Sequence, residues 1–266
     1  MSSIMFLGTS SYAGKTLLSA VYCRHLASEG RDVVPFKASD LTSNVFVTSD
    51  GKKMGMGQAV QAWVSGTEPE TDMNPVLMMP GKSRTVDVLV GGIRRYTISG
   101  GCEPDTDDLL GYALDSFDNL TERHDAVVCE GAGSPVEMNL IDRDIANMKM
   151  VTERNIPSVL VADIERGGVF AAIYGTWKLI PEKDRCHLKG YIINRFRGEE
   201  SVLKDGIDTI CSLTGMKCYG VVPYVDLRKP DTHSDDISER FTKEIDRIMP
   251  EIEKHLDFSG LDSLLS

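Results

Sequence analysis

The feature that most constrains the fold lies near the amino terminus, where an apolar run of strand length leads into GTSSYAGKT, residues 8–16. The stretch approximates the phosphate-loop pattern G-x4-G-K-[ST], although its first glycine stands one position early, at Gly8. Such a turn joins a strand to a helix and presents backbone N–H groups and the helix amino terminus to a phosphate. The alternative is a glycine-containing turn with a solvated lysine.

Within this loop, two side chains have distinct predicted roles. Lys15 is expected to neutralise the β- and γ-phosphates of a nucleotide, and the Thr16 hydroxyl is expected to bind Mg²⁺. The other positions expected to line the nucleotide are Thr9, Ser10, Ala13, Gly14 and Leu17.

Apolar runs of strand length alternate with helical patterns along the chain. The runs are 3–8, 32–37, 126–131, 158–163, 189–195 and 219–224. Several are near-continuous in Val, Ile and Leu, as expected of strands covered on both faces by helices. Residues 15–30 are predicted to form the first helix, with Gly30 as its stop. The alternation predicts an α/β fold with a doubly wound, mostly parallel sheet flanked by helices, typical of phosphate-loop NTPases.

Two segments stand apart from this alternation. Residues 81–105 are predicted to be a loop or a short hairpin insertion. Residues 229–266 are predicted to be a helical tail that follows one domain spanning 1–228, and Pro250 is expected to break or kink its helix. The apolar residues of the tail recur at helical spacing, at Ile237, Phe241, Ile245, Ile248 and Ile252. This stripe is expected to pack on the domain or on a partner.

Charge and composition exclude several classes of protein. The net charge of −11 argues against nucleic acid and against an anionic membrane surface as partners. No apolar run approaches the ~18 residues of a membrane span, and the start of the chain lacks the pattern of a signal peptide. The six cysteines are scattered, which suits reduced thiols. A cytoplasmic protein is therefore expected.

A phosphate loop requires a carboxylate at the end of another strand to support the metal. Glu130 ends the apolar run AVVC and is followed by Gly-Ala-Gly, and Asp40 follows the run VVPFK. Lys37, close to Asp40, is a candidate for facing the reacting phosphoryl group. Solvated loop charges are the alternative for all three residues.

Several stretches, in the expected order, resemble the synthetase half of cobyric acid synthase across most of residues 3–225. They are GTSSYAGKT, PFK, MGMGQAVQAW (54–63), DMNPVLMMP (72–80), CEGAGSPVEMNLIDRDIANM (129–148), VADIERGGVFA (161–171), GYIINRFRG (190–198) and GVVPY (220–224). The two patterns EGAGSPxExNLxxxDIxNM and DIxRGGVFA are far more specific than a phosphate loop alone. The chain is similar, more loosely, to dethiobiotin synthetase and cobyrinic acid diamide synthase, which share this ATP-using fold.

The resemblance implies an ATP- and Mg²⁺-dependent amidoligase that activates a corrinoid carboxylate as an acyl phosphate, which ammonia then converts to an amide. The implied catalytic residues are Lys15, Lys37, Asp40 and Glu130, and the implied metal ligands are Thr16, Asp40 and Glu130. Asn194 and Pro223 would contact the adenine, although Asn194 could instead cap a turn. The implied substrate contacts are Gln58, Asn74, Asn139, Asp144, Asn147, Asp163 and Arg166. An ion pair between Arg166 and Asp163 is the alternative for those two residues.

The chain departs from the family pattern in three ways. The family usually continues into a glutaminase half, whereas the sequence ends at Ser266, and Cys102 lacks the surroundings of a glutaminase nucleophile, so it is interpreted as a loop thiol. Ser39-Asp40 replaces the usual Gln-Asn, which is closer to the dethiobiotin and diamide synthetase pattern. Met79 replaces a frequent lysine.

Four hypotheses follow from these patterns. The first is a synthetase subunit of a split cobyric acid synthase, supplied by a separate glutaminase or by free ammonia. The second is a paralogue that acts on a different carboxylate. The third is a nucleotide-switched ATPase that binds a partner through its tail helix, and the fourth is an inactive relic. A homodimer is compatible with the first two.

Overall fold

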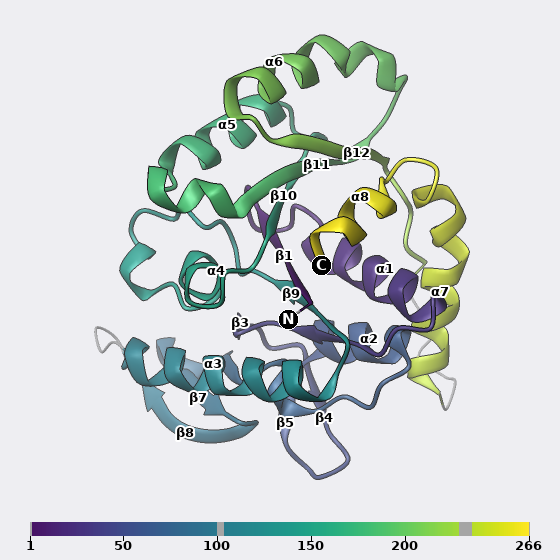
Figure 1. The fold of residues 1–266 in the computed structure, drawn as a ribbon. Coiled ribbons are helices and arrows are strands. Elements are labelled where there is room, and N and C mark those ends of the chain that lie inside the picture. The colour runs from purple at the N-terminus through teal and green to yellow at the C-terminus, as the bar shows by residue number, and fades with distance from the viewer. Residues whose placement is uncertain (1, 100–103, 229–235, 266) are drawn as a thin grey trace.

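The computed structural model describes residues 2–99, 104–228 and 236–265, and its main sheet has six parallel strands in the order β12-β11-β10-β1-β9-β2 (Figure 1). The strands are β1 (Ser3–Gly8), β2 (Val33–Phe36), β9 (Ala126–Glu130), β10 (Ser158–Asp163), β11 (Leu188–Phe196) and β12 (Lys217–Pro223). Each overlaps one of the six predicted runs. The predicted α/β fold with a parallel, helix-flanked sheet is therefore confirmed.

Helices cover both faces of this sheet because successive side chains of each strand point to opposite faces. In β1, Ile4 and Phe6 pack into one apolar cluster with α1, α7 and α8, whereas Met5 and Leu7 pack into another with α3, α4, α5 and α6. The helices are α1 (Lys15–Ser28), α2 (Met56–Ser65), α3 (Thr106–Arg123), α4 (Met148–Arg154), α5 (Val169–Leu179), α6 (Lys204–Thr214), α7 (Ile237–Ile252) and α8 (Phe258–Asp262). The helix predicted over 15–30 is α1, and Gly30 follows it with a left-handed φ of 81°.

A second sheet lies beside the first, in the order β3-β6-β7-β8, and was not predicted from the sequence (Figure 1). Its strands are β3 (Ser39–Leu41), β6 (Val76–Pro80), β7 (Val86–Val90) and β8 (Ile93–Ile98), and a small antiparallel pair, β4 (Val45–Val47) and β5 (Lys53–Gly55), precedes α2. The hairpin considered for 81–105 is the β7–β8 pair. Cys102 lies outside the described residues, so its interpretation as a loop thiol stays a prediction.

The tail helix packs on the chain's own core. Asp236 caps α7 by accepting hydrogen bonds from the N–H groups of Ser238 and Glu239. Ile245, Ile248 and Ile252 of the apolar stripe are buried in the cluster that contains α1, whereas Ile237, at the start of the helix, is 42% exposed. The expected break at Pro250 is wrong, because α7 continues to Ile252. Pro250 lies in the last turn, and because it has no N–H it leaves the Asp246 carbonyl without the usual helical hydrogen bond.

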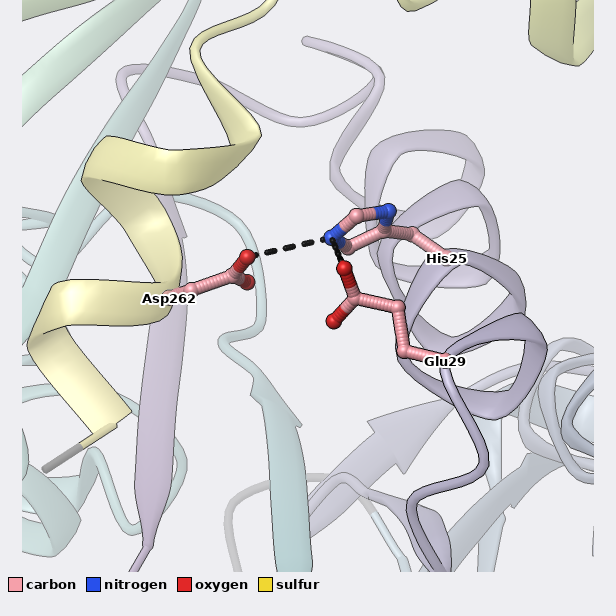
Figure 2. A group of neighbouring side chains, drawn as sticks. All are labelled: His25, Glu29 and Asp262. Carbon is pink, nitrogen blue, oxygen red and sulfur yellow. Dashed lines mark hydrogen bonds and ion pairs between the residues drawn. The ribbon is translucent and has the colours of Figure 1, made fainter.

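Figure 2 shows how the carboxyl-terminal segment is held on α1. Asp262 of α8 lies 3.2 Å from His25 Nε2, whose other neighbour is Glu29 at 3.7 Å. The buried Tyr22 hydroxyl donates a 2.8 Å hydrogen bond to the same Asp262 carboxylate. The ring of Phe258 stacks on His25 with 4.2 Å between centroids.

Within the described ranges, no helix is long and apolar enough to cross a membrane.

Candidate active site

Glu130 is the centre of a polar cluster at the carboxyl edge of the main sheet. It ends β9, and its side chain is only 2% exposed. Thr16 Oγ1 donates a 2.8 Å hydrogen bond to Oε1, and Lys37 Nζ lies 3.3 Å from the same oxygen. Parallel strands bring these groups together, because β1, β2 and β9 all end at this edge and lead into Gly8, Lys37 and Glu130.

The phosphate loop leads into α1 at Gly14, a position where any other residue would be strained. Gly14 adopts a left-handed φ of 103°, and a Cβ at this position would lie 2.0 Å from Asn194 Nδ2. Asn194 donates from Nδ2 to the Ala13 carbonyl at 2.9 Å. The buried Asn194 therefore supports the loop from β11, next to the position where an adenine contact is predicted. Pro223 ends the neighbouring strand β12, in register with Phe196.

The Lys15 side chain is buried within the phosphate loop. Its Nζ donates to the carbonyls of Ser10 at 3.2 Å and Gly133 at 2.8 Å. Burial lowers the pKa of Lys15 to about 8, although the Glu130 carboxylate opposes this shift. The backbone around it is held by the Thr9 N–H, which donates to the Val161 carbonyl at 3.0 Å. Leu17, the last of the residues predicted to line the nucleotide, lies half-buried in the first turn of α1.

Lys37 is held between two carboxylates. Its Nζ lies 2.9 Å from Asp40 Oδ1 and 3.3 Å from Glu130 Oε1. Burial alone would lower the pKa of Lys37, but the charges of Glu130 and Asp40 raise it above its ordinary value. Burial would likewise raise the pKa of Glu130, but Lys37 and the hydrogen bonds from Thr16 and Gln61 lower it. Both groups therefore stay charged at neutral pH, and Lys37 cannot act as a general base.

The oxygen groups at this edge fit a divalent cation such as Mg²⁺. Thr16, Glu130 and Asp40 are hard oxygen donors of the kind that Mg²⁺ prefers. Beside them, Gln58 Oε1 and Gln61 Oε1 are buried acceptors without a hydrogen-bond partner in the described structure. Buried acceptors rarely stay unpaired, and water molecules carried by a cation would supply the donors.

The residues predicted to contact the substrate fall into two groups. Gln58 and Asn74 are fully buried and belong to the cluster. Gln58 Nε2 lies 3.4 Å from Glu130, and Asn74 Nδ2 donates a hydrogen bond to the Lys37 carbonyl. Asn139 and Arg166 instead have exposed side chains, and neither joins the described network around Glu130. Of the two alternatives for Arg166, the ion pair with Asp163 is wrong, because Asp163 pairs with Arg195 at 2.7 Å.

Asp144 and Asn147 form one unit in the loop after β9. Asp144 Oδ1 accepts hydrogen bonds from the N–H groups of Ala146 and Asn147 and from Asn147 Nδ2. Burial raises the pKa of Asp144, although these bonds oppose the shift. Asn147 also donates to the Ala132 carbonyl at 2.7 Å and keeps a buried, unpaired Oδ1 directed at Gly131, next to Glu130. Asp144 thus positions Asn147, which is the better placed of the two to contact a substrate.

Gln61 also belongs to this site and was not predicted from the sequence. Its Nε2 donates to Glu130 Oε2 at 2.9 Å and to the Thr16 carbonyl at 3.2 Å, so it links the carboxylate to the phosphate loop. The signal was present, because Gln58 and Gln61 stand three residues apart and lie on the same side of a helix. The Gly133 carbonyl, which accepts a hydrogen bond from Lys15, was not predicted either. Every residue has a backbone carbonyl, so the residue type does not indicate which one accepts.

Comparisons with known proteins show which sequences and folds the chain is similar to. Residues 4–236 match the family described as the CobQ/CobB/MinD/ParA nucleotide binding domain. The chain is 43% identical, over 98% of its length, to a probable cobyric acid synthase of Methanosphaerula palustris, of which it covers 55%. It is 44% identical, over 85% of its length, to a cobyric acid synthase of Cutibacterium acnes, of which it covers 47%. The chain thus spans about half the length of the curated relatives it matches.

Solved structures support the fold alone. A structure of the MinC:MinD cell division protein complex of Aquifex aeolicus matches with a TM-score of 0.51 and 12% identity, over 98% of this chain and 95% of that one. The signal recognition particle receptor FtsY of Elizabethkingia anophelis, in complex with GDP, matches with a TM-score of 0.51 and 14% identity, over 92% of this chain and 63% of that one.

Proposed function

The chain belongs to the CobQ/CobB/MinD/ParA nucleotide binding domain family, and from this premise we propose that it is an ATP-dependent amidoligase of the cobyric acid synthase type. Its substrate would be a corrinoid with free side-chain carboxylates. The observation that carries the proposal is that Thr16 and Lys37 contact Glu130 at the end of β9, at the sheet edge where the phosphate loop with Lys15 would hold a γ-phosphate. Phosphoryl transfer to a carboxylate needs such charge and positioning and little acid–base chemistry.

The reaction has two steps. A substrate carboxylate oxygen attacks the γ-phosphorus, the bond to the β-phosphate oxygen breaks, and ADP leaves. Ammonia then attacks the acyl carbon of the acyl phosphate, the C–O bond to phosphate breaks, and the nitrogen loses one proton. Lys15 and Lys37 offset the charge that develops on the transferred group, which is how such sites lower the barrier. Mg²⁺, held by Thr16, Glu130 and Asp40, would neutralise the phosphate oxygens.

A large substrate would reach beyond this cluster. A cavity of about 370 Å³ borders β5 and the second sheet, and Lys53, Arg94 and Met79 line it. Lys53 lies two residues before Gly55, which touches the site through Gln58 and Asn74. Lys53 and Arg94 would supply cations for an anionic substrate where the family's lysine is replaced by Met79. This cavity supports a substrate that carries several carboxylates.

The nitrogen source follows from the same proposal. We propose that ammonia reaches this site either free or from a separate glutaminase. Homodimerisation is also proposed. Light scattering behind size-exclusion chromatography would test it, and a monomer at micromolar concentration would contradict it.

The test is ADP release by the purified chain with Mg-ATP, with and without adenosylated cobyrinic acid a,c-diamide, and with ammonium or glutamine. Turnover that requires both the corrinoid and ammonium, and that glutamine alone does not sustain, is the expected result. ATP binding without a corrinoid response would favour a different carboxylate, for which Asp40 and Met79 already argue. Slow hydrolysis indifferent to every carboxylate would instead indicate a nucleotide switch.

A further inference from the structure

Three side chains of metal-binding type meet between α1 and α8, away from the phosphate loop (Figure 2). His25 and Glu29 stand four residues apart at the carboxyl end of α1, and Asp262 is the last residue of α8. His25 Nε2, one oxygen of Glu29 and one oxygen of Asp262 all lie within 4.8 Å of one another. Lys15 begins α1 and His25 lies in its last turn, about 15 Å further along the helix, so this group is separate from the candidate active site.

The distances in this group suit a shared cation better than hydrogen bonds from the imidazole to both acids. His25 Nε2 lies 3.2 Å from Asp262 Oδ2 and 3.7 Å from Glu29 Oε1. Nε2 carries at most one proton, and the longer of the two separations exceeds the length of a hydrogen bond. Zn²⁺ binds imidazole nitrogen and carboxylate oxygen at about 2.0–2.2 Å in a tetrahedron, which places two ligand atoms about 3.4 Å apart. The two separations measured from Nε2 lie on either side of that value.

Neighbouring side chains orient two of the three ligands. The buried Tyr22 hydroxyl donates a 2.8 Å hydrogen bond to Asp262 Oδ1, and the other carboxylate oxygen, Oδ2, faces His25. The His25 ring stacks on Phe258 with 24° between the ring planes. Outer groups that fix the orientation of ligands strengthen metal binding. Asp262 and His25 therefore need little rearrangement to bind an ion.

The charge at this position also favours a cation. Two carboxylates face one imidazole nitrogen, and Glu29 is the residue that caps the carboxyl end of α1. The last carbonyls of a helix carry partial negative charge, so an acidic side chain is unfavourable there and a cation is favourable. A divalent ion between the three ligands would offset the charge of both acids.

His255 provides a comparison within the same chain. It too has two acidic neighbours, but Glu251 lies 3.6 Å from its Nε2 and Glu200 lies 3.8 Å from its Nδ1. The two ring nitrogens point in different directions, so one ion cannot join both acids to this ring. Among the described residues, no other group of three His, Cys, Asp or Glu side chains has ligand atoms as close together as the group at His25.

We propose that His25, Glu29 and Asp262 form a zinc site that fastens the carboxyl-terminal segment to α1. His25 binds through neutral Nε2 and each acid binds through one oxygen, so any proton on Nε2 is released when the ion binds. Water completes the coordination, because the Glu29 side chain is half exposed. The imidazole ligand favours Zn²⁺ over Mg²⁺, which prefers oxygen ligands alone. This site is independent of the proposed amidoligase reaction.

Calorimetric titration of the full chain, purified without a histidine tag, with ZnCl₂ in excess Mg²⁺ tests the site. The unchanged chain is expected to bind Zn²⁺, and Glu29→Gln should weaken this binding at least about tenfold, since even the loss of a group that only supports a ligand has an effect of that size. Asp262→Asn keeps an acceptor for Tyr22 and should weaken it as well. Glu251→Gln is the matched control, because it removes a half-exposed acid four residues from His255, and it should bind Zn²⁺ like the unchanged chain.

Thermal unfolding tests the fastening role and needs no enzyme activity. Because an ion that binds only the folded chain stabilises it, saturating Zn²⁺ should raise the thermal midpoint of the unchanged chain and of Glu251→Gln above the value in EDTA. Glu29→Gln should unfold near the same temperature as the unchanged chain in EDTA and gain little from Zn²⁺. A chain that binds no Zn²⁺, or one in which Glu29→Gln and Asp262→Asn bind it as tightly as the unchanged chain, would overturn the site. Zinc bound through Glu29 without a rise in the midpoint would overturn the fastening role. A zinc response in a chain that forms no amide would retain the site and leave only the amidoligase proposal contradicted.

Discussion

At the scale of single residues, the site depends on compensated buried charge. Lys15, Lys37 and Glu130 are each less than a tenth exposed, and an isolated charge at such a depth would cost several kcal/mol. The contacts among Glu130, Lys37 and Asp40 offset that cost and keep both Lys37 and Glu130 ionised. Lys15 is the exception, since its contacts are to carbonyls and burial lowers its pKa to about 8.

This lowered pKa predicts how nucleotide binding depends on pH. ATP phosphates favour protonated Lys15, so binding raises its pKa above the value of about 8 in the free chain. Affinity should therefore be constant below pH 8 and fall above it, by up to about tenfold per pH unit. Titration of an ATP analogue between pH 7 and 9.5 measures this. Lys15→Arg keeps its charge throughout, and a decline as steep in that variant as in the unchanged chain would contradict the assignment.

Asp40 allows a second test at this scale. If it supports Mg²⁺, Asp40→Asn should raise the Mg²⁺ concentration for half-maximal ADP formation about tenfold, the usual effect of disturbing a metal's supporting groups. The titration is run at saturating ammonium, so that the attack of ammonia does not limit the rate. Asp50→Asn, on the exposed β4–β5 turn, removes the same charge and serves as the control. An unchanged Mg²⁺ titration would mean that Asp40 pairs with Lys37 but does not support the metal.

At the scale of elements, the parallel strands were predictable and the second sheet was not. The strands of the main sheet are buried on both faces, so their sequences are continuous apolar runs that stand out from their surroundings. In the second sheet, β8 reads IRRYTI and is largely exposed, and β3 has three residues. The strands of the small β4–β5 pair also have three residues each. Such segments have too little apolar periodicity to be distinguished from loops. The second sheet matters because β3 carries Asp40, which contacts Lys37.

The carboxyl-terminal segment yields a stability prediction. Asp262→Ala leaves the buried Tyr22 hydroxyl without its acceptor and removes the contact to His25, so it should lower the free energy of unfolding by about 1–3 kcal/mol. Asp246→Ala removes a half-exposed ion pair to Arg24 that also joins this segment to α1, and should cost no more than about 1 kcal/mol. Denaturant unfolding of both variants measures the difference. Equal losses would show that the Tyr22–Asp262–His25 contacts do not anchor the segment.

At the scale of the whole molecule, the sequence motifs predicted which residues gather at the carboxyl edge of the main sheet, but not all of the hydrogen bonds that connect them. Lys15, Thr16, Lys37, Asp40 and Glu130 were named from strand ends and the phosphate loop. The structure links the last four through side-chain contacts, whereas Lys15 contacts the Ser10 and Gly133 carbonyls. The role of Gln61 was not predicted, because it depends on how α2 docks against the main sheet. Asn139 and Arg166 were named from the family pattern and lie exposed, so their roles stay predictions.

The central claim is that the chain transfers the γ-phosphoryl group of ATP to a carboxylate. Its most direct test is an isotope experiment with adenosylated cobyrinic acid a,c-diamide whose carboxylates carry ¹⁸O, together with Mg-ATP and ammonium. If the carboxylate oxygen attacks phosphorus and the acyl phosphate then loses phosphate to ammonia, each amide formed must be matched by one ¹⁸O in inorganic phosphate. ADP formed together with unlabelled phosphate would mean that water, and not a carboxylate, receives the phosphoryl group, and would contradict the account.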